Sequence, residues 1–70
     1  MQDLHIGKAI RKVLDERQMS VVSFAERLSC SRVNAYRIFA NRTIDSGQLL
    51  KISRILDHDF FKEYSDLLCR

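Results

Sequence analysis

The sequence contains no proline and no tryptophan, and it has only two glycines and two cysteines. Because proline and glycine are the residues that most often interrupt helices, their scarcity favours an all-α fold. Cys30 and Cys69 are too few for a disulfide framework, and no C-x-x-C or Cys/His ligand spacing accompanies them. We therefore expect no metal site, and we expect Cys30 to be a small buried apolar residue rather than a redox sensor.

Long apolar runs are also missing. No stretch approaches the roughly 18 apolar residues that a membrane span needs, and the N-terminus lacks the apolar core of a secretory signal. The sequence shows no paired carboxylates, no nucleophile beside an orienting base and no glycine-rich phosphate loop. His5 and His58 have no ligand-spaced partner and are expected on the surface. We expect a soluble cytoplasmic protein that is not an enzyme and binds no membrane, cofactor or small-molecule ligand.

The sequence does contain apolar residues at helical spacing. Ile6, Ile10, Val13 and Leu14 follow the i, i+4, i+7, i+8 pattern that lines one face of a helix. A chain of 70 residues, 46% hydrophobic and 30% charged, is sufficient for one small globular domain. Such patterns predict a single all-α domain over residues 1–70, with five helices. The five helices are expected at about residues 5–17, 21–28, 32–40, 46–56 and 60–69.

Polar residues mark the expected starts of four of these helices. Ser20, Ser31 and Asp59 each precede a helical pattern and can accept hydrogen bonds from its first amides. Asp45 is followed three residues later by Gln48, the arrangement of a capping box. These signals mark where four of the five helices are expected to begin.

The segment after residue 55 combines large apolar side chains with acidic ones. Phe60, Phe61 and Tyr64 recur at helical spacing and are expected in the core, since the neighbouring carboxylates would repel the phosphates of a stacked nucleotide. If Phe61, Tyr64 and Leu68 are instead exposed, the last helix can form a dimer interface. The main alternative function is therefore a helical protein-protein interaction module that uses this acidic, aromatic helix.

Charge is unevenly distributed along the chain. Residues 1–26 are neutral in balance, residues 27–54 carry a net charge of +5, and residues 55–69 carry −3. Between residues 27 and 44 there are four arginines and no carboxylate to neutralise them. This asymmetry favours a polyanion that approaches one side of the molecule.

The second and third predicted helices, separated by residues 29–31, form a helix-turn-helix unit. On the third helix, Ala35, Ile38 and Phe39 fall on one apolar arc that can pack against the other helices. The opposite arc, expected to read bases in the major groove of double-stranded DNA, consists of Arg32, Val33, Tyr36 and Arg37. An arginine fork can donate two hydrogen bonds to guanine, and a valine can contact a thymine methyl group.

A second group of side chains lies near helix ends and in the loop after the third helix, where phosphates are commonly held. Its members are Ser31, Asn34, Arg42 and Thr43. Three further cations can add affinity that falls as salt rises, namely Arg27, Lys51 and Arg54.

Residues 6–11, 19–28, 31–41 and 49–64 together resemble the lambda-repressor and Cro-like helix-turn-helix family of bacterial transcription regulators. The resemblance implies a five-helix repressor-type domain that binds operator DNA, usually as a homodimer. The base-reading positions of the family fall on Arg32, Val33 and Arg37, with Asn34 and Tyr36 adjacent. Its phosphate-contacting positions fall near the start of the second helix, at Ser20, and on Asn34, Arg42 and Thr43.

The chain departs from the family pattern at three positions. Ser29 and Gln18 replace glycines that the family has in the turn and at the end of the first helix, and a serine in a left-handed turn carries strain of roughly 1 kcal/mol. Ala35 replaces a larger β-branched residue on the buried side of the reading helix, which predicts a closer approach to the second helix.

Overall fold

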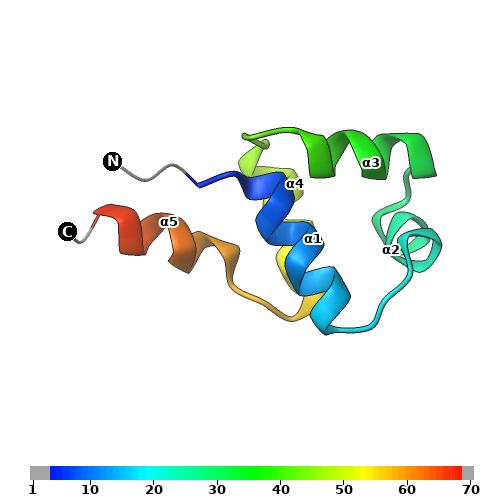
Figure 1. Cartoon of the computed structure of the whole chain (residues 1–70), viewed down its shortest axis with the longest axis horizontal. Helices are drawn as coiled ribbons and strands as arrows, with labels where there is room; N and C mark the ends of the chain where they lie inside the picture. The colour runs from blue at the N-terminus through cyan, green and yellow to red at the C-terminus, as the bar shows by residue number, and fades with distance from the viewer. Residues whose placement is uncertain (1–3, 69–70) are drawn as a thin grey trace.

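The computed structural model describes residues 4–68, which form five α-helices and no strand (Figure 1). The helices are α1 (Ile6–Glu16), α2 (Val21–Leu28), α3 (Arg32–Ala40), α4 (Ser46–Leu56) and α5 (Phe60–Leu68). The predicted all-α fold is confirmed, and so are the bounds of the middle three helices. The first helix was predicted one residue too long at each end, because His5 and Arg17 flank it as caps. The predicted last helix reached residue 69, which lies outside the described residues, as does Cys69.

A single hydrophobic core joins all five helices. In Figure 1, α1 crosses the centre of the molecule in front of α4, α3 runs along one edge, and α5 extends away from the side where α2 lies. The buried apolar residues are Ile6, Ile10, Val13, Leu14, Phe24, Ala25, Leu28, Ala35, Ile38, Leu49, Ile52, Leu56 and Phe60. Since α5 supplies only Phe60, the first four helices provide nearly the whole core.

Side-chain caps begin the helices where the sequence predicts them. The Oγ of Ser20 accepts a hydrogen bond from the Ser23 amide at 3.0 Å, and Asp45 accepts one from the Gln48 amide at 3.1 Å. Ser31 and Asp59 cap α3 and α5 in the same way. His5 was expected to be an ordinary surface residue, but its Nδ1 accepts from the Lys8 amide at 3.1 Å and caps α1. Each cap satisfies an amide that the helix itself leaves open.

Three helices end on a residue in the left-handed conformation, and none of the three is glycine. Gln18, Ser29 and Asp57 have φ angles of 57°, 60° and 51°. After α2, the Cys30 amide donates to the Ala25 carbonyl at 2.9 Å and the Ser29 amide to that of Glu26, which is a Schellman motif. The same pair of bonds follows α1 and α4. The left-handed geometry expected for Asp57 and for the turn at Ser29 is therefore present.

Gly7 allows α1 to approach the C-terminal end of α3 very closely. A Cβ atom at this position would lie 2.2 Å from the Phe39 carbonyl oxygen and 2.5 Å from that of Ile38. The amides of Ile6 and Gly7 donate to the carbonyls of Arg42 and Asn41, each at 3.1 Å. The first turn of α1 thus binds the backbone that follows α3, and only glycine leaves room for the contact.

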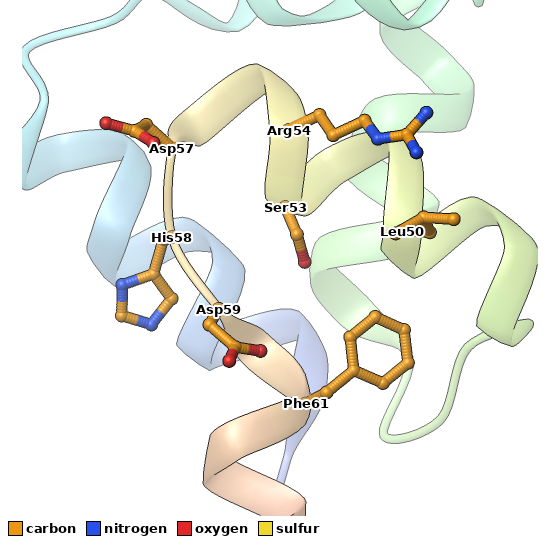
Figure 2. A pocket seen from close by; sticks show the side chains of 7 residues that line it. All are labelled: Leu50, Ser53, Arg54, Asp57, His58, Asp59 and Phe61. Carbon is orange, nitrogen blue, oxygen red and sulfur yellow. The ribbon is translucent and has the colours of Figure 1, made fainter.

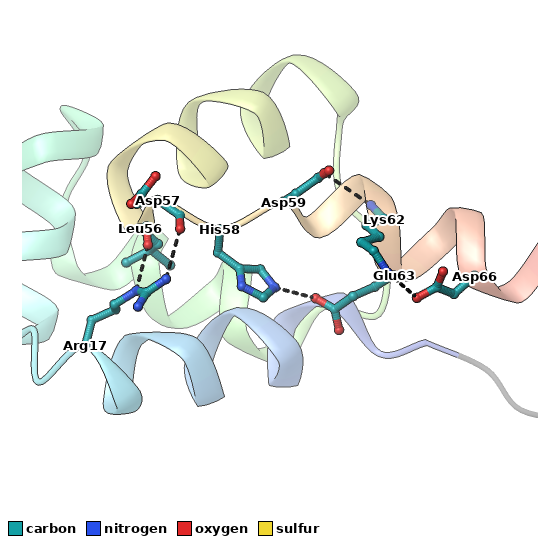
Figure 3. A network of polar contacts seen from close by, with 8 residues as sticks. All are labelled: Arg17, Leu56, Asp57, His58, Asp59, Lys62, Glu63 and Asp66. Carbon is teal, nitrogen blue, oxygen red and sulfur yellow. Dashed lines mark hydrogen bonds and ion pairs between the residues drawn. The ribbon is translucent and has the colours of Figure 1, made fainter.

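Polar contacts connect α5 with the loop before it, and α1 with the end of α4 (Figure 3). His58, expected to be a simple surface residue, lies 3.1 Å from a Glu63 carboxylate oxygen, and its ring packs on Phe60 with centroids 4.5 Å apart. Arg17 donates from Nε to the Leu56 carbonyl and from Nη2 to the Asp57 carbonyl, both at 2.9 Å. Arg17 therefore ties the end of α1 to the end of α4.

The prediction that Phe61 belongs to the core is wrong, because its side chain is 39% exposed while Phe60 is fully buried. Tyr64 is half-buried against the core, and Leu68 is 86% exposed. Since α5 extends from the body rather than lying along it, only Phe60 in its first turn is fully buried, and Tyr64 in its second turn is covered in part. Cys30 was expected to be buried, but it is only partly buried, because it lies in the turn after α2.

Candidate nucleic-acid interface

The unit formed by α2 and α3 is compact because its turn is short and hydrogen-bonded to the helices on both sides. Ser29 takes the left-handed conformation that reverses the chain, Cys30 packs against the core, and Ser31 caps the next helix. The Ser31 hydroxyl accepts from the Asn34 amide at 3.2 Å. Three residues thus end one helix and begin the next, which fixes the direction in which α3 leaves α2.

The inner face of α3 is held by small and aromatic side chains. Ala35 is fully buried and Ile38 nearly so. Phe39 is partly buried, and its ring stacks on that of Phe24 in α2 with centroids 5.6 Å apart. These are the three side chains that the sequence assigned to the packed arc, and together with the Gly7 contact they fix α3 against α1 and α2.

The outer face of α3 carries the four side chains predicted to read bases. Arg32 and Arg37 are exposed, and neither forms an ion pair within residues 4–68. Val33 is 62% exposed and Tyr36 56% exposed, although the Tyr36 ring meets the Phe39 ring edge-on at a centroid distance of 6.1 Å. The face therefore offers two cations and two apolar surfaces that no other part of the described chain covers.

The side chains predicted to contact phosphate lie around this face on several elements. Ser20 is the N-cap of α2 and lines a surface hollow together with Ser23 and Arg27. Asn34 is exposed in the first turn of α3, and its amide is already bonded to Ser31. Because the Ser20 and Ser31 oxygens accept backbone amides, their hydroxyl hydrogens stay available to donate to an anion.

The loop after α3 brings Arg42 and Thr43 to the surface at the end of the helix that is bound to α1. Both residues are exposed, and the carbonyl of Arg42 accepts the Ile6 amide at 3.1 Å. The backbone of this loop is thus fixed at an exposed position. Such a placement suits contacts that set the register of a ligand along α3.

Other cations predicted to add affinity lie farther from α3. Lys51 lines a hollow between α2 and α4, and Arg54 lines a groove between α4 and α5 that also holds Asp57 and Asp59 (Figure 2). This groove is lined by residues of both charge signs. The predicted contact residues of α3 and of the loop that follows it therefore lie together, whereas Arg54 lies at the groove between α4 and α5.

Sequence reasoning missed Gly7 and Arg17, which position the interface without belonging to it. Gly7 sets the distance between α1 and α3, and Arg17 ties α1 to α4. Both contacts join residues far apart in the chain, so no local pattern signals them. Within residues 4–68, no group of three or more metal-ligating side chains occurs and no helix is both long and apolar enough to cross a membrane.

Comparison with known proteins agrees with this arrangement. A family model described as the Cro/C1-type helix-turn-helix DNA-binding domain matches residues 9–60, which is more than half of the chain. The chain belongs to the Cro/C1-type family. The match includes all of α2, α3 and α4 and most of α1. Searches of curated proteins and of solved structures found no match.

Membership of the Cro/C1-type family establishes the general activity. The protein is a DNA-binding transcription regulator with an all-α helix-turn-helix fold. The family is one of DNA-binding regulators, which supports the prediction that this chain is not an enzyme. In this Cro/C1-type domain, the exposed outer face of α3 carries the positive charge that suits a polyanion.

Proposed function

We propose that this Cro/C1-type domain binds double-stranded DNA sequence-specifically, with α3 in the major groove. The observation that carries the proposal is the uncovered outer face of α3, where Arg32, Val33, Tyr36 and Arg37 project from a helix packed on its other side. A major groove about 12 Å wide admits an α-helix, and each base pair presents a distinct donor and acceptor pattern there.

Each side chain of this face has a chemical role in the proposal. Arg32 and Arg37 donate paired hydrogen bonds to O6 and N7 of guanine, and each such contact discriminates against other bases by about 1 to 3 kcal/mol. Val33 contacts a thymine methyl group, and Tyr36 combines apolar contact with a hydroxyl that can reach a base edge or a phosphate. The half-site should therefore contain guanines next to a thymine.

The second group of side chains sets the register of the helix on the duplex. Ser20 and Ser31 donate hydroxyl hydrogens to phosphate oxygens, and Asn34, Arg42 and Thr43 contact the backbone beside α3. These contacts carry no base preference of their own. When a cationic side chain neutralises a phosphate, counterions are released from the DNA, so affinity should fall steeply as the salt concentration is raised.

A binding-site selection from randomised duplexes tests the base-reading assignment. Arg37→Ala should relax the preference at one base position, whereas Arg42→Ala should weaken binding to all sequences about equally. Lys12→Ala, on α1 and away from α3, serves as the control for losing one exposed cation. Identical selected sequences and equal affinity losses for the Arg37 and Arg42 variants would show that α3 does not read bases through Arg37.

We further propose that two copies bind one operator as a homodimer. Leu50 and Phe61 are exposed beside a groove of about 460 Å³ between α4 and α5 (Figure 2). Arg54 lies on the α4 side of this groove, while Asp57 and Asp59 lie on the loop side. A two-fold axis would therefore place opposite charges and two apolar surfaces against each other.

The dimer predicts a palindromic selected site with half-sites roughly one helical turn apart. Phe61→Glu should remove the palindrome and lower the mass of the DNA complex in sedimentation experiments, while binding to a single half-site persists. A non-palindromic site bound by one copy would contradict the dimer. The alternative of an interaction module in place of DNA binding is not favoured, because the family match is to a DNA-binding domain.

We propose that the regulator acts as a repressor in the bacterial cytoplasm, by occupying an operator that overlaps a promoter. The resemblance to repressor-type domains supports this proposal, because a protein bound in the major groove at a promoter excludes other proteins from the same DNA. A reporter gene placed behind the selected operator shows whether binding lowers or raises expression. Reduced expression is the expected result, and increased expression would identify an activator.

A further inference from the structure

Arg11 on α1 has an unusually defined environment for an exposed cation. Its guanidinium carbon lies 5.4 Å from the centroid of the Phe39 ring, and its Nε lies 3.5 Å from a carboxylate oxygen of Asp15. The Arg11 side chain is nevertheless 44% exposed. An arginine over an aromatic face is held by a cation-π attraction. Arg11 is thus positioned while its tip remains accessible.

The same aromatic ring connects Arg11 to the outer face of α3. Phe39 packs on Phe24 with a stacked geometry, and Tyr36 meets it edge-on with centroids 6.1 Å apart. Phe39 therefore has Arg11 over its ring and Tyr36 at its edge. The exposed cation of α1 and the exposed phenol of α3 are neighbours through one shared side chain.

The helical register of α1 explains why Arg11 lies on this side. Arg11 follows Gly7 by four residues, so the two share one face of α1, and Gly7 is where α1 touches the end of α3. Lys12 comes about 100° further round the helix, on a different face, and is also exposed. Two adjacent residues of equal charge therefore differ in their position relative to α3.

We infer that Arg11 is a DNA-phosphate contact supplied by α1, held in place by Phe39 and Asp15 and connected to Tyr36 through the Phe39 ring. The inference rests on the proposed docking of α3 in the major groove. Asp15 is contacted through Nε, so the two Nη groups at the tip can donate to the oxygens of one phosphate. Because Phe39 restrains the side chain before binding, less conformational entropy is lost when the phosphate is engaged.

The experiment measures binding to a fixed duplex by fluorescence anisotropy over a series of salt concentrations. Arg11→Gln should reduce the slope of log affinity against log salt by about 0.9, the effect of one lost phosphate contact on duplex DNA. The base preference should stay unchanged, because a phosphate contact carries no sequence information. Lys12→Gln removes the same charge from the neighbouring position and should leave the slope as in the wild type.

A third variant separates the contact from folding. Arg11→Lys keeps the charge and should retain the slope, while both Arg11 variants are checked for an unchanged unfolding midpoint. Equal slopes for Arg11→Gln and Lys12→Gln would overturn the inference while leaving the docking of α3 intact. Absence of salt-dependent binding by the wild-type chain would instead overturn the proposed function itself, and the two failures are thereby distinguished.

Discussion

The helices α3 and α5 have the same length of nine residues but are attached to the molecule in different ways. The inner face of α3 is packed along its length through Ala35 and Ile38, and its C-terminal end is bound to α1 at Gly7. In α5 only Phe60, in the first turn, is buried. One helix is therefore fixed at both ends and the other at one end.

The difference in attachment goes with a difference in charge and in expected use. A helix that reads bases has to be held within a fraction of an ångström, because hydrogen bonds to base edges tolerate little displacement. The cationic α3 meets this requirement. The acidic α5 leaves Phe61 and Leu68 exposed, which suits an interface that forms only when a second copy arrives.

The largest expected effect concerns the attachment of α5. Phe60→Ala should destabilise the domain by about 4 kcal/mol, because it removes a fully buried ring and leaves a cavity. Phe61→Ala, the same change at the next residue, should cost under about 1 kcal/mol because that ring is 39% exposed. Urea unfolding monitored by circular dichroism measures both. Equal losses would mean that Phe61 packs on the core as fully as Phe60 does.

The attachment of α3 can be tested at the glycine that permits it. Gly7→Ala should destabilise by about 3 kcal/mol, because the added Cβ would overlap three backbone carbonyls and force α1 away from α3. Gly47→Ala is the matched control, since its Cβ meets only the Asp45 carboxylate at 3.1 Å. Placed in the first turn of α4, that alanine should be neutral or stabilising by up to about 1 kcal/mol. A tolerated Gly7→Ala would show that the two helices can separate at little cost.

A smaller effect of opposite sign, an increase in stability, is expected in the turn that leads into α3. Ser29→Gly should stabilise the domain by about 1 kcal/mol, because Ser29 has a φ of 60° and glycine adopts this conformation without strain. Ser23→Gly, inside α2, is the same substitution in helical geometry and should destabilise by about 0.5 kcal/mol. Thermal unfolding of both variants measures whether each one is more or less stable than the wild type. A destabilising Ser29→Gly would indicate that the serine is favoured there for a reason other than its backbone.

The smallest expected effect is a pH dependence confined to α5. Partial burial, and secondarily the charge of Glu63, raise the pKa of Tyr64 above its ordinary value of 10.0. The neutral phenol is therefore favoured in the folded state, so its contribution to stability is complete below pH 10 and is lost as the pH rises beyond it. Unfolding measured from pH 9 to 11 should show a steeper loss for the wild type than for Tyr64→Phe. Parallel profiles would contradict the assignment.

Much of the fold was predictable because its signals are local. The caps at Ser20, Ser31 and Asp45 each bond an amide three residues ahead, so sequence spacing reveals them. The two faces of α3 follow from helical periodicity in the same way. The helix-turn-helix unit and the exposure of its four predicted base-reading side chains could be anticipated for this reason.

The remaining features depend on contacts between distant parts of the chain. Arg17 bonds carbonyls 39 and 40 residues away, and Gly7 meets the backbone after α3. Phe60 and Phe61 look alike in sequence, and only the direction in which α5 leaves the body decides which one is buried. Arg11 belongs to a segment whose charges balance, so its position beside Phe39 gave no signal in the charge pattern.

The bonds between the start of α1 and the loop after α3 also provide a natural reporter. The first amides of a helix usually exchange their hydrogens with water quickly, because the helix gives them no acceptor. Here the Ile6 and Gly7 amides are bonded to the carbonyls of Arg42 and Asn41. Their exchange with deuterium therefore measures how often α3 separates from α1, and it should slow further when DNA holds α3 in its groove.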